Sequence, residues 1–189
     1  MIRTRRERTL RRLGRLIVPL LLLAAGPASL DAEFRDAAPP GWIVEEKRET
    51  SYAWIRFSKS LELDGEDYRD ASITLYRIEV DTDPLTAGEE LAGKKVEGQA
   101  VTRRADVGRN LGGVLWQGFE ADYRAESGAV RHEEYLFTGI EGGPLYVFWA
   151  RGPAASWEAD AQLRQRSLEK VAAKLGAERS DPEEVEEKR

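Results

Sequence analysis

The chain has 189 residues, with 29 lysines and arginines, 34 aspartates and glutamates, a formal net charge of −5 and no cysteine. This length is enough for one domain with its own hydrophobic core. Without cysteine, disulfides, thiol catalysis and thiolate metal sites are excluded. The acidic balance disfavours nucleic acid and anionic lipid as partners, because both are bound through positive charge.

The first 32 residues have the order of an export signal. Seven arginines within residues 1–15 precede an uncharged apolar run over residues 16–25, and small residues follow. A membrane-spanning helix needs about 20 apolar residues, so this short run favours a signal peptide, cut after Ala28 or Ala32, over a retained membrane anchor. Cleavage over 1–32 removes seven arginines and two acids and changes the net charge from −5 to −10. We therefore expect a periplasmic or extracellular protein without a stable membrane span.

Residues 33–40, which include the run AAPP, are predicted to be a linker into a single domain over residues 41–175. Strands are predicted where apolar residues alternate along the chain or fill both faces of a short segment. They are the segment that begins at Trp42 and the segments 52–58, 71–80, 112–123, 130–138 and 145–150, with a further short strand considered within 100–107.

Two helices are predicted. Thr86 with Glu89 has the spacing of a capping box, which begins a helix that runs to about residue 96. The second helix covers residues 154–175 and is ended by a glycine, after which the charged residues 176–189 are predicted to be a disordered tail. Hairpin connections and two helices predict an α+β fold with an antiparallel sheet between helices.

The sequence Pro40-Gly41-Trp42, a strand that ends in Phe57, and the run Ala71-Ser-Ile-Thr-Leu resemble the start of Mog1/PsbP-like domains, which include the bacterial DcrB-like proteins. The later helices and strands continue the resemblance over about residues 39–175. The resemblance implies an α/β/α sandwich and a binding or accessory role, with no shared catalytic residues. The export signal sets aside the cytoplasmic and nuclear roles of that group.

His132 is the only histidine and would have to be the base of any serine-type triad. Its charged neighbours indicate an exposed strand position, and the chain has no Gly-x-Ser-x-Gly motif. One histidine without cysteine also cannot supply the usual ligands of a zinc site. We therefore assign no catalytic residue and no metal site on this histidine.

Paired carboxylates offer a second chemistry, because glycosidases use two of them. Glu120 and Asp122 lie two apart on one strand, and Glu62 and Asp64 lie two apart near a strand end. Such pairs are also what the polar face of an alternating strand contains. We treat them as candidates for a carboxylate site and favour the polar-face interpretation.

Two loop motifs are weaker. Asp64, Glu66, Asp67 and Asp70 form an acidic turn, but it lacks the glutamate that closes a calcium-binding loop. The glycines from Gly108 to Gly113 lead into a strand, whereas a phosphate loop leads into a helix. We predict no metal and no cofactor from either motif.

The tryptophans supply the remaining candidates. Trp42, Trp149 and Trp157 fit the core, whereas Trp54 and Trp116 lie opposite the main apolar face of their strands. Trp54 and Trp116 are candidates for a partner or ligand surface, with packing beneath a helix as the alternative. The sequence thus predicts an exported, non-enzymatic binding or accessory protein of the periplasm or cell envelope, with an unidentified protein or small ligand as partner. The alternative is a small-molecule-binding or hydrolytic domain with a carboxylate or aromatic site.

Overall fold

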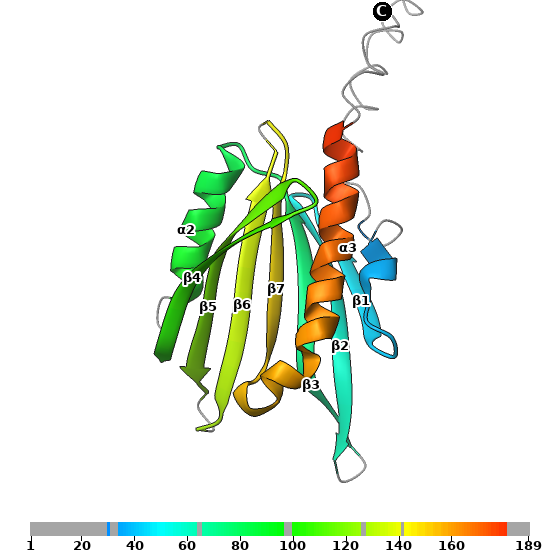
Figure 1. Ribbon diagram of the computed structural model, residues 1–189, viewed down its shortest axis with the longest axis vertical. Helices are drawn as coiled ribbons and strands as arrows, with labels where there is room; N and C mark the ends of the chain where they lie inside the picture. Colours follow the sequence, from blue (N-terminus) through cyan, green and yellow to red (C-terminus); the bar gives the residue numbers. More distant parts are fainter. Residues whose placement is uncertain are drawn as a thin grey trace, which may run out of the picture.

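The computed structural model describes residues 30, 34–63, 66–96, 100–125, 128–140 and 142–180. These residues form one antiparallel sheet, two α-helices and two 3-10 helices (Figure 1). In chain order the elements are η2 (Arg35–Ala37), β1 (Ile43–Arg48), β2 (Tyr52–Leu63), β3 (Glu66–Ile78), α2 (Pro84–Val96), β4 (Val101–Leu111), β5 (Val114–Arg124), β6 (Val130–Gly139), β7 (Leu145–Pro153), η3 (Ala154–Asp160) and α3 (Ala161–Ser180).

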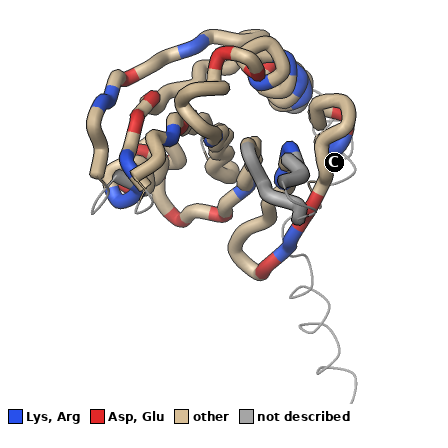
Figure 2. The backbone as a smooth tube through the Cα atoms, turned by 90° about the horizontal axis from the view of Figure 1, so that it is seen from below, with Lys and Arg blue, Asp and Glu red and all other residues tan. Residues whose placement is uncertain are grey.

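The seven strands lie in the order β1-β2-β3-β7-β6-β5-β4, and every neighbouring pair is antiparallel. Two runs of hairpins, β1 to β3 and β4 to β7, therefore join where β7 pairs with β3. Seen along the strands in Figure 2, the sheet curls strongly, and basic and acidic positions are interspersed around it. The predicted α+β class with an antiparallel sheet is confirmed.

Each helix packs on its own face of the sheet, and the alternation of strand residues divides the core in two. On β6, Leu136 faces α3, whereas Tyr135 and Phe137 face α2. The core on the α3 face is the larger, and α3 runs nearly parallel to the strands across it (Figure 1). The largest fully buried side chains include Trp116, Phe34, Phe57, Phe119, Phe148, Ile55, Ile73, Leu75, Leu136, Leu145, Leu168 and Leu175.

Helix α2 begins with a different cap from the predicted one. Asp83 Oδ2 accepts hydrogen bonds from the backbone N–H of Thr86 at 2.8 Å and from its hydroxyl at 3.0 Å. Asp83 is the N-cap, because the residue before a proline favours the extended backbone that a cap requires, and Pro84 suits the first helical position. The predicted box of Thr86 with Glu89 is wrong.

Helix α3 continues through Gly176 to Ser180, so this glycine does not end the helix. A Cβ atom added to Gly176 would lie 2.8 Å from the backbone oxygen of Gly112. The glycine therefore permits the β4–β5 turn to approach the helix closely. The rest of the predicted tail, residues 181–189, lies outside the described residues.

The segment expected to be a linker packs against α3. Phe34 is fully buried, Ser167 Oγ donates to the backbone oxygen of Ala37 at 2.8 Å, and Lys174 Nζ lies 2.8 Å from Asp36 Oδ1. Leu30, within the predicted signal, is 3% exposed and belongs to the same core. Of the helices in the described ranges, none is long and apolar enough to cross a membrane; the apolar run 16–25 lies outside those ranges.

Candidate functional site

An open cleft of about 670 Å³ lies between the first half of α3, with η3 before it, and strands β4 to β6. Its lining is dominated by long polar side chains of both charges. The strands place alternating residues on this face, and the helix adds residues one turn apart, so the cleft is built from regular elements rather than loops. Such a site is held more rigidly than one on loops.

The register of β5 and β6 brings together residues that the sequence analysis considered separately. Asp122 lies directly opposite His132, and Glu120 lies directly opposite Glu134. All four side chains line the cleft. The candidate pair Glu120 and Asp122 and the single histidine therefore belong to one site, and Glu134 joins them.

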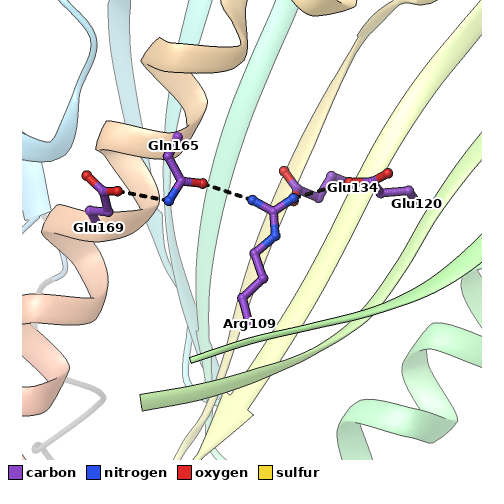
Figure 3. Close-up of polar contacts among 5 residues, drawn as sticks. All are labelled: Arg109, Glu120, Glu134, Gln165 and Glu169. Atoms are coloured by element: carbon purple, nitrogen blue, oxygen red, sulfur yellow. Dashed lines mark hydrogen bonds and ion pairs between the residues drawn. The ribbon is translucent and has the colours of Figure 1, made fainter. Parts of the chain in front are cut away.

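Arg109 of β4 links this site across two strands and the helix (Figure 3). Its Nη2 forms ion pairs with Glu134 and, at 3.2 Å, with Glu120 Oε1. Its Nη1 donates to Gln165 Oε1 at 2.9 Å, and Gln165 Nε2 donates to Glu169 at 2.9 Å. A single guanidinium thus fixes two carboxylates of the sheet and one amide of α3, as its planar fork allows.

Glu134 is the most buried acid of the cleft, with a side chain 4% exposed. Burial raises its pKa above the usual range, Arg109 opposes that shift, and the nearby Glu120 adds to it. Glu134 was not among the residues predicted from the sequence. Its signal was present, since Glu134 stands two residues after His132 on one face of a predicted strand, but the strand register was needed to read it.

His132 is less exposed than predicted, with a side chain 16% exposed. Its Nδ1 lies 2.6 Å from Asp122 Oδ1, and its ring packs 4.4 Å from the Trp157 ring. Arg164 lies over the same tryptophan, 3.4 Å from the ring centre, and donates to the Trp157 backbone oxygen at 2.5 Å. Charged neighbours in the sequence suggested exposure, but η3 folds back and covers this part of β6.

The structure does not bring the two candidate tryptophans together. Trp116 is fully buried on the α3 face and makes an edge contact with Phe148, with ring centres 6.5 Å apart. Trp54 is half-buried on the α2 face, with Arg56 4.9 Å from its ring centre. Trp42, Trp149 and Trp157 pack partly buried against the two cores.

Most of the remaining sequence candidates lie outside the described residues. Asp64 lies outside the described residues, as do the side chains of Glu62, Glu66, Asp67 and Asp70. In the glycine-rich segment, Gly112 and Gly113 form the β4–β5 turn. Within the described part of the chain, no three histidine, aspartate or glutamate side chains are grouped to hold a metal ion.

No protein-family model and no curated protein matches the chain. Among solved structures it is similar to LpqN of Mycobacterium tuberculosis, described as involved in cell envelope biogenesis, with 13% identity over 68% of this chain and 75% of that chain and a TM-score of 0.47. It is also similar to PA94 of Pseudomonas aeruginosa, a protein of unknown function described as a putative regulator, with 13% identity over 59% of this chain and 94% of that chain and a TM-score of 0.39. At this identity and these TM-scores, the likenesses assign neither a family nor a function.

Proposed function

We propose that this chain is an exported, non-enzymatic binding or accessory protein of the periplasm or cell envelope, built as a Mog1/PsbP-like α/β/α sandwich. We further propose that it holds a small polar ligand in the cleft between α3 and strands β4 to β6. The observation that carries the proposal is the ion pair of Arg109 with the buried Glu134 in the lining of that cleft. Burying a charge costs several kcal/mol before pairing, and here the buried carboxyl group of Glu134 lies beside an open cavity.

The contacts of the cleft favour binding over reaction. Arg109 holds both Glu120 and Glu134, and Asp122 lies against His132, so all five ionisable groups have protein partners. Planar side chains fixed by such contacts are suited to directed hydrogen bonds with a ligand, because little entropy is lost when the ligand binds. The network is therefore a preorganised polar surface.

The charges around the cleft indicate the class of ligand. Four arginines (Arg103, Arg109, Arg164, Arg166) and five acids (Glu120, Asp122, Glu134, Glu158, Glu169) line it, so positive and negative groups nearly balance. A strongly charged ligand would leave charges of one sign uncompensated in a partly buried site. We therefore propose a neutral or zwitterionic polar ligand, such as a saccharide or a short peptide.

The test compares two neighbouring residues of β4. Arg103 lines the cleft, whereas Arg104 points to the other face and contacts Phe119. The purified protein is screened by thermal shift against saccharides, amino acids, dipeptides and phosphorylated compounds, and hits are measured by calorimetry. We expect Arg103→Ala to weaken binding about tenfold, the loss of one charge-assisted hydrogen bond, and Arg104→Ala to leave it within twofold. Failure of every neutral and zwitterionic compound to bind would contradict the proposal.

Hydrolysis is a second candidate function, and the raised pKa of Glu134 opposite Glu120 is the observation that favours it. An acid with a raised pKa beside a second carboxyl group is the pair that glycosidases use. Its test is turnover of chromogenic glycosides and esters by the same purified protein. Turnover that Glu134→Gln abolishes while ligand affinity is kept would replace the binding proposal with this one.

A further inference from the structure

The α2 face of the sheet carries a second surface, on the other side of the sheet from the cleft. Two segments repeat the pattern tryptophan, any residue, arginine: Trp54 to Arg56 on β2 and Trp149 to Arg151 on β7. Both strands pair with β3, from its opposite sides. Since alternate residues of a strand share a face, these four side chains stand on the α2 face, and we call them the arginine platform.

Each arginine of the platform makes the same two contacts. The guanidinium carbon of Arg56 lies 4.9 Å, and that of Arg151 lies 5.0 Å, from the ring centre of the tryptophan in its own segment. Nε of Arg56 donates to Thr74 Oγ1 and Nε of Arg151 donates to Ser72 Oγ, both at 3.2 Å. Ring stacking and the hydrogen bond together fix the orientation of each guanidinium.

Neither platform arginine forms an ion pair within the described ranges, although Glu45 lies directly opposite Arg56, and Glu133, which pairs with Lys95, lies directly opposite Arg151. The Nη atoms of Arg56 and Arg151 form no hydrogen bond or ion pair there, since their side-chain bonds run through Nε. Arg104 shows the contrast on the same face, because it stacks on Phe119 at 4.7 Å but also pairs with Asp106 at 3.4 Å. The platform thus presents two oriented guanidinium groups whose Nη atoms form no ion pair in the described part of the chain.

Helix α2 covers only the β7 side of the platform, where Lys95 Nζ lies 4.3 Å from the ring centre of Trp149. Its main strand contacts are with β5, β6 and β7, whereas the platform extends from β7 across β3 to β2. Trp54, Arg56, Trp149 and Arg151 are all half-buried. Their Nη donors are the groups that a partner on this face would meet.

The spacing of the two hydroxyl groups suggests the shape of that partner. Thr74 and Ser72 are two residues apart on β3, so their side chains are separated by about 7 Å on one face. The two guanidinium groups converge on these hydroxyls from β2 and β7. In an extended peptide, side chains two residues apart have the same spacing and also share one face. Two carboxylates in the pattern Glu-x-Glu therefore match the two arginines.

We propose that the arginine platform is a docking surface for an extended acidic segment of a partner protein, which lies along β3 with alternate carboxylates on Arg56 and Arg151. Each guanidinium fork accommodates a carboxylate through two parallel hydrogen bonds. The acidic net charge of the chain, −5 overall, opposes the dense negative charge of a lipid surface or a sulfated polysaccharide more than it opposes one short peptide.

The proposal is tested with three nine-residue peptides and calorimetry. One alternates glutamate with threonine, the second has the same composition with the glutamates in one block, and the third has glutamine for glutamate. We expect the alternating peptide to bind with the highest affinity of the three. Its affinity should fall as the salt concentration is raised and should not change when ligands of the cleft are added. Heparin and vesicles that contain anionic phospholipid are measured beside the peptides.

The variants are Arg56→Gln and Arg151→Gln, with Arg104→Gln as the matched control on the same face. Each platform variant is expected to lower the affinity for the alternating peptide about tenfold, and the control is expected to change that affinity less than twofold. Arg56→Lys and Arg151→Lys, which keep the charge but lose the fork, should give intermediate affinities in protein shown to be folded by circular dichroism. Equal binding of the block peptide, tighter binding of heparin or vesicles, or no binding of the alternating peptide would overturn the proposal.

Discussion

At the scale of single residues, Glu134 is the most buried acid of the cleft. Its carboxyl group is buried beside Arg109, and burial raises its pKa above the ordinary value of 4.5. An acid whose pKa is raised in the folded state stabilises the fold most when it is protonated. Its contribution is complete below about pH 4.5 and is lost as the pH rises through the folded-state pKa.

This sign predicts the behaviour of Glu134→Gln. The free energy of unfolding of the wild type minus that of the variant should fall as the pH rises from about 4 to 8, because only the wild type loses the contribution of this acid. Urea unfolding followed by tryptophan fluorescence at several pH values measures the difference. Leu115→Ala, an exposed change that does not titrate, is the control. A difference that stays flat or increases with pH would contradict the assignment.

The candidate site was predictable from the sequence only in parts. Glu120, Asp122 and His132 were recognisable as chemically capable residues, but each had a plausible reading as the polar face of a strand. What joins them is the register across β5 and β6, and register is set by a turn whose geometry the residue types do not specify. Arg109 lies in the glycine-rich segment, which was considered only as a phosphate loop, so its part in the site was not predicted.

At the scale of elements, α2 contains two glycines whose surroundings differ. Gly88 and Gly93 both lower the intrinsic stability of this helix. A Cβ atom on Gly88 would lie 2.3 Å from Phe137 Cδ2, whereas one on Gly93 would meet nothing within 4 Å. Gly88 is therefore required by the packing of α2 on β6, and Gly93 is not.

Two alanine substitutions should then act in opposite directions. Gly93→Ala should stabilise the protein by about 0.5–1 kcal/mol, because alanine loses less backbone entropy in a helix. Gly88→Ala should destabilise it by about 1–3 kcal/mol, the usual cost of overpacking a filled interface. Thermal and urea unfolding of both variants provide the measurement. Two effects of the same sign would show that the contact with Phe137 does not control this helix.

Element boundaries were less predictable than element types. Strand β4 runs over Val101–Leu111, although only a short strand was considered there, because most of its side chains are exposed and leave no apolar pattern. Gly176 looked like a helix stop, and only the approach of the β4–β5 turn explains its place inside α3. The alternation of apolar residues predicted the buried strands, whereas the exposed strand and the end of α3 depend on tertiary contacts.

At the scale of the whole molecule, the N-terminal segment joins the predicted export signal to the core. Leu30 and Phe34 are buried in the core on the α3 face, and η2 between Phe34 and β1 is fixed to α3 through Ser167 and Lys174. Cleavage after Ala32 would remove Leu30 from this core, whereas cleavage after Ala28 would keep it. The packing thus favours the earlier of the two predicted cleavage points.

The expected result is a mature protein that begins at Ser29. Intact mass and N-terminal sequencing of protein recovered from the cell envelope measure this directly. A chain that begins at Glu33 should be less stable in urea than one that begins at Ser29 by about 2–5 kcal/mol, the cost of emptying a leucine site in a core. Leu30→Ala in the longer chain should reproduce most of that loss. Equal stability of the two chains would show that Leu30 does not belong to the folded domain, and an uncleaved N-terminus would replace the export proposal with the membrane-anchored alternative.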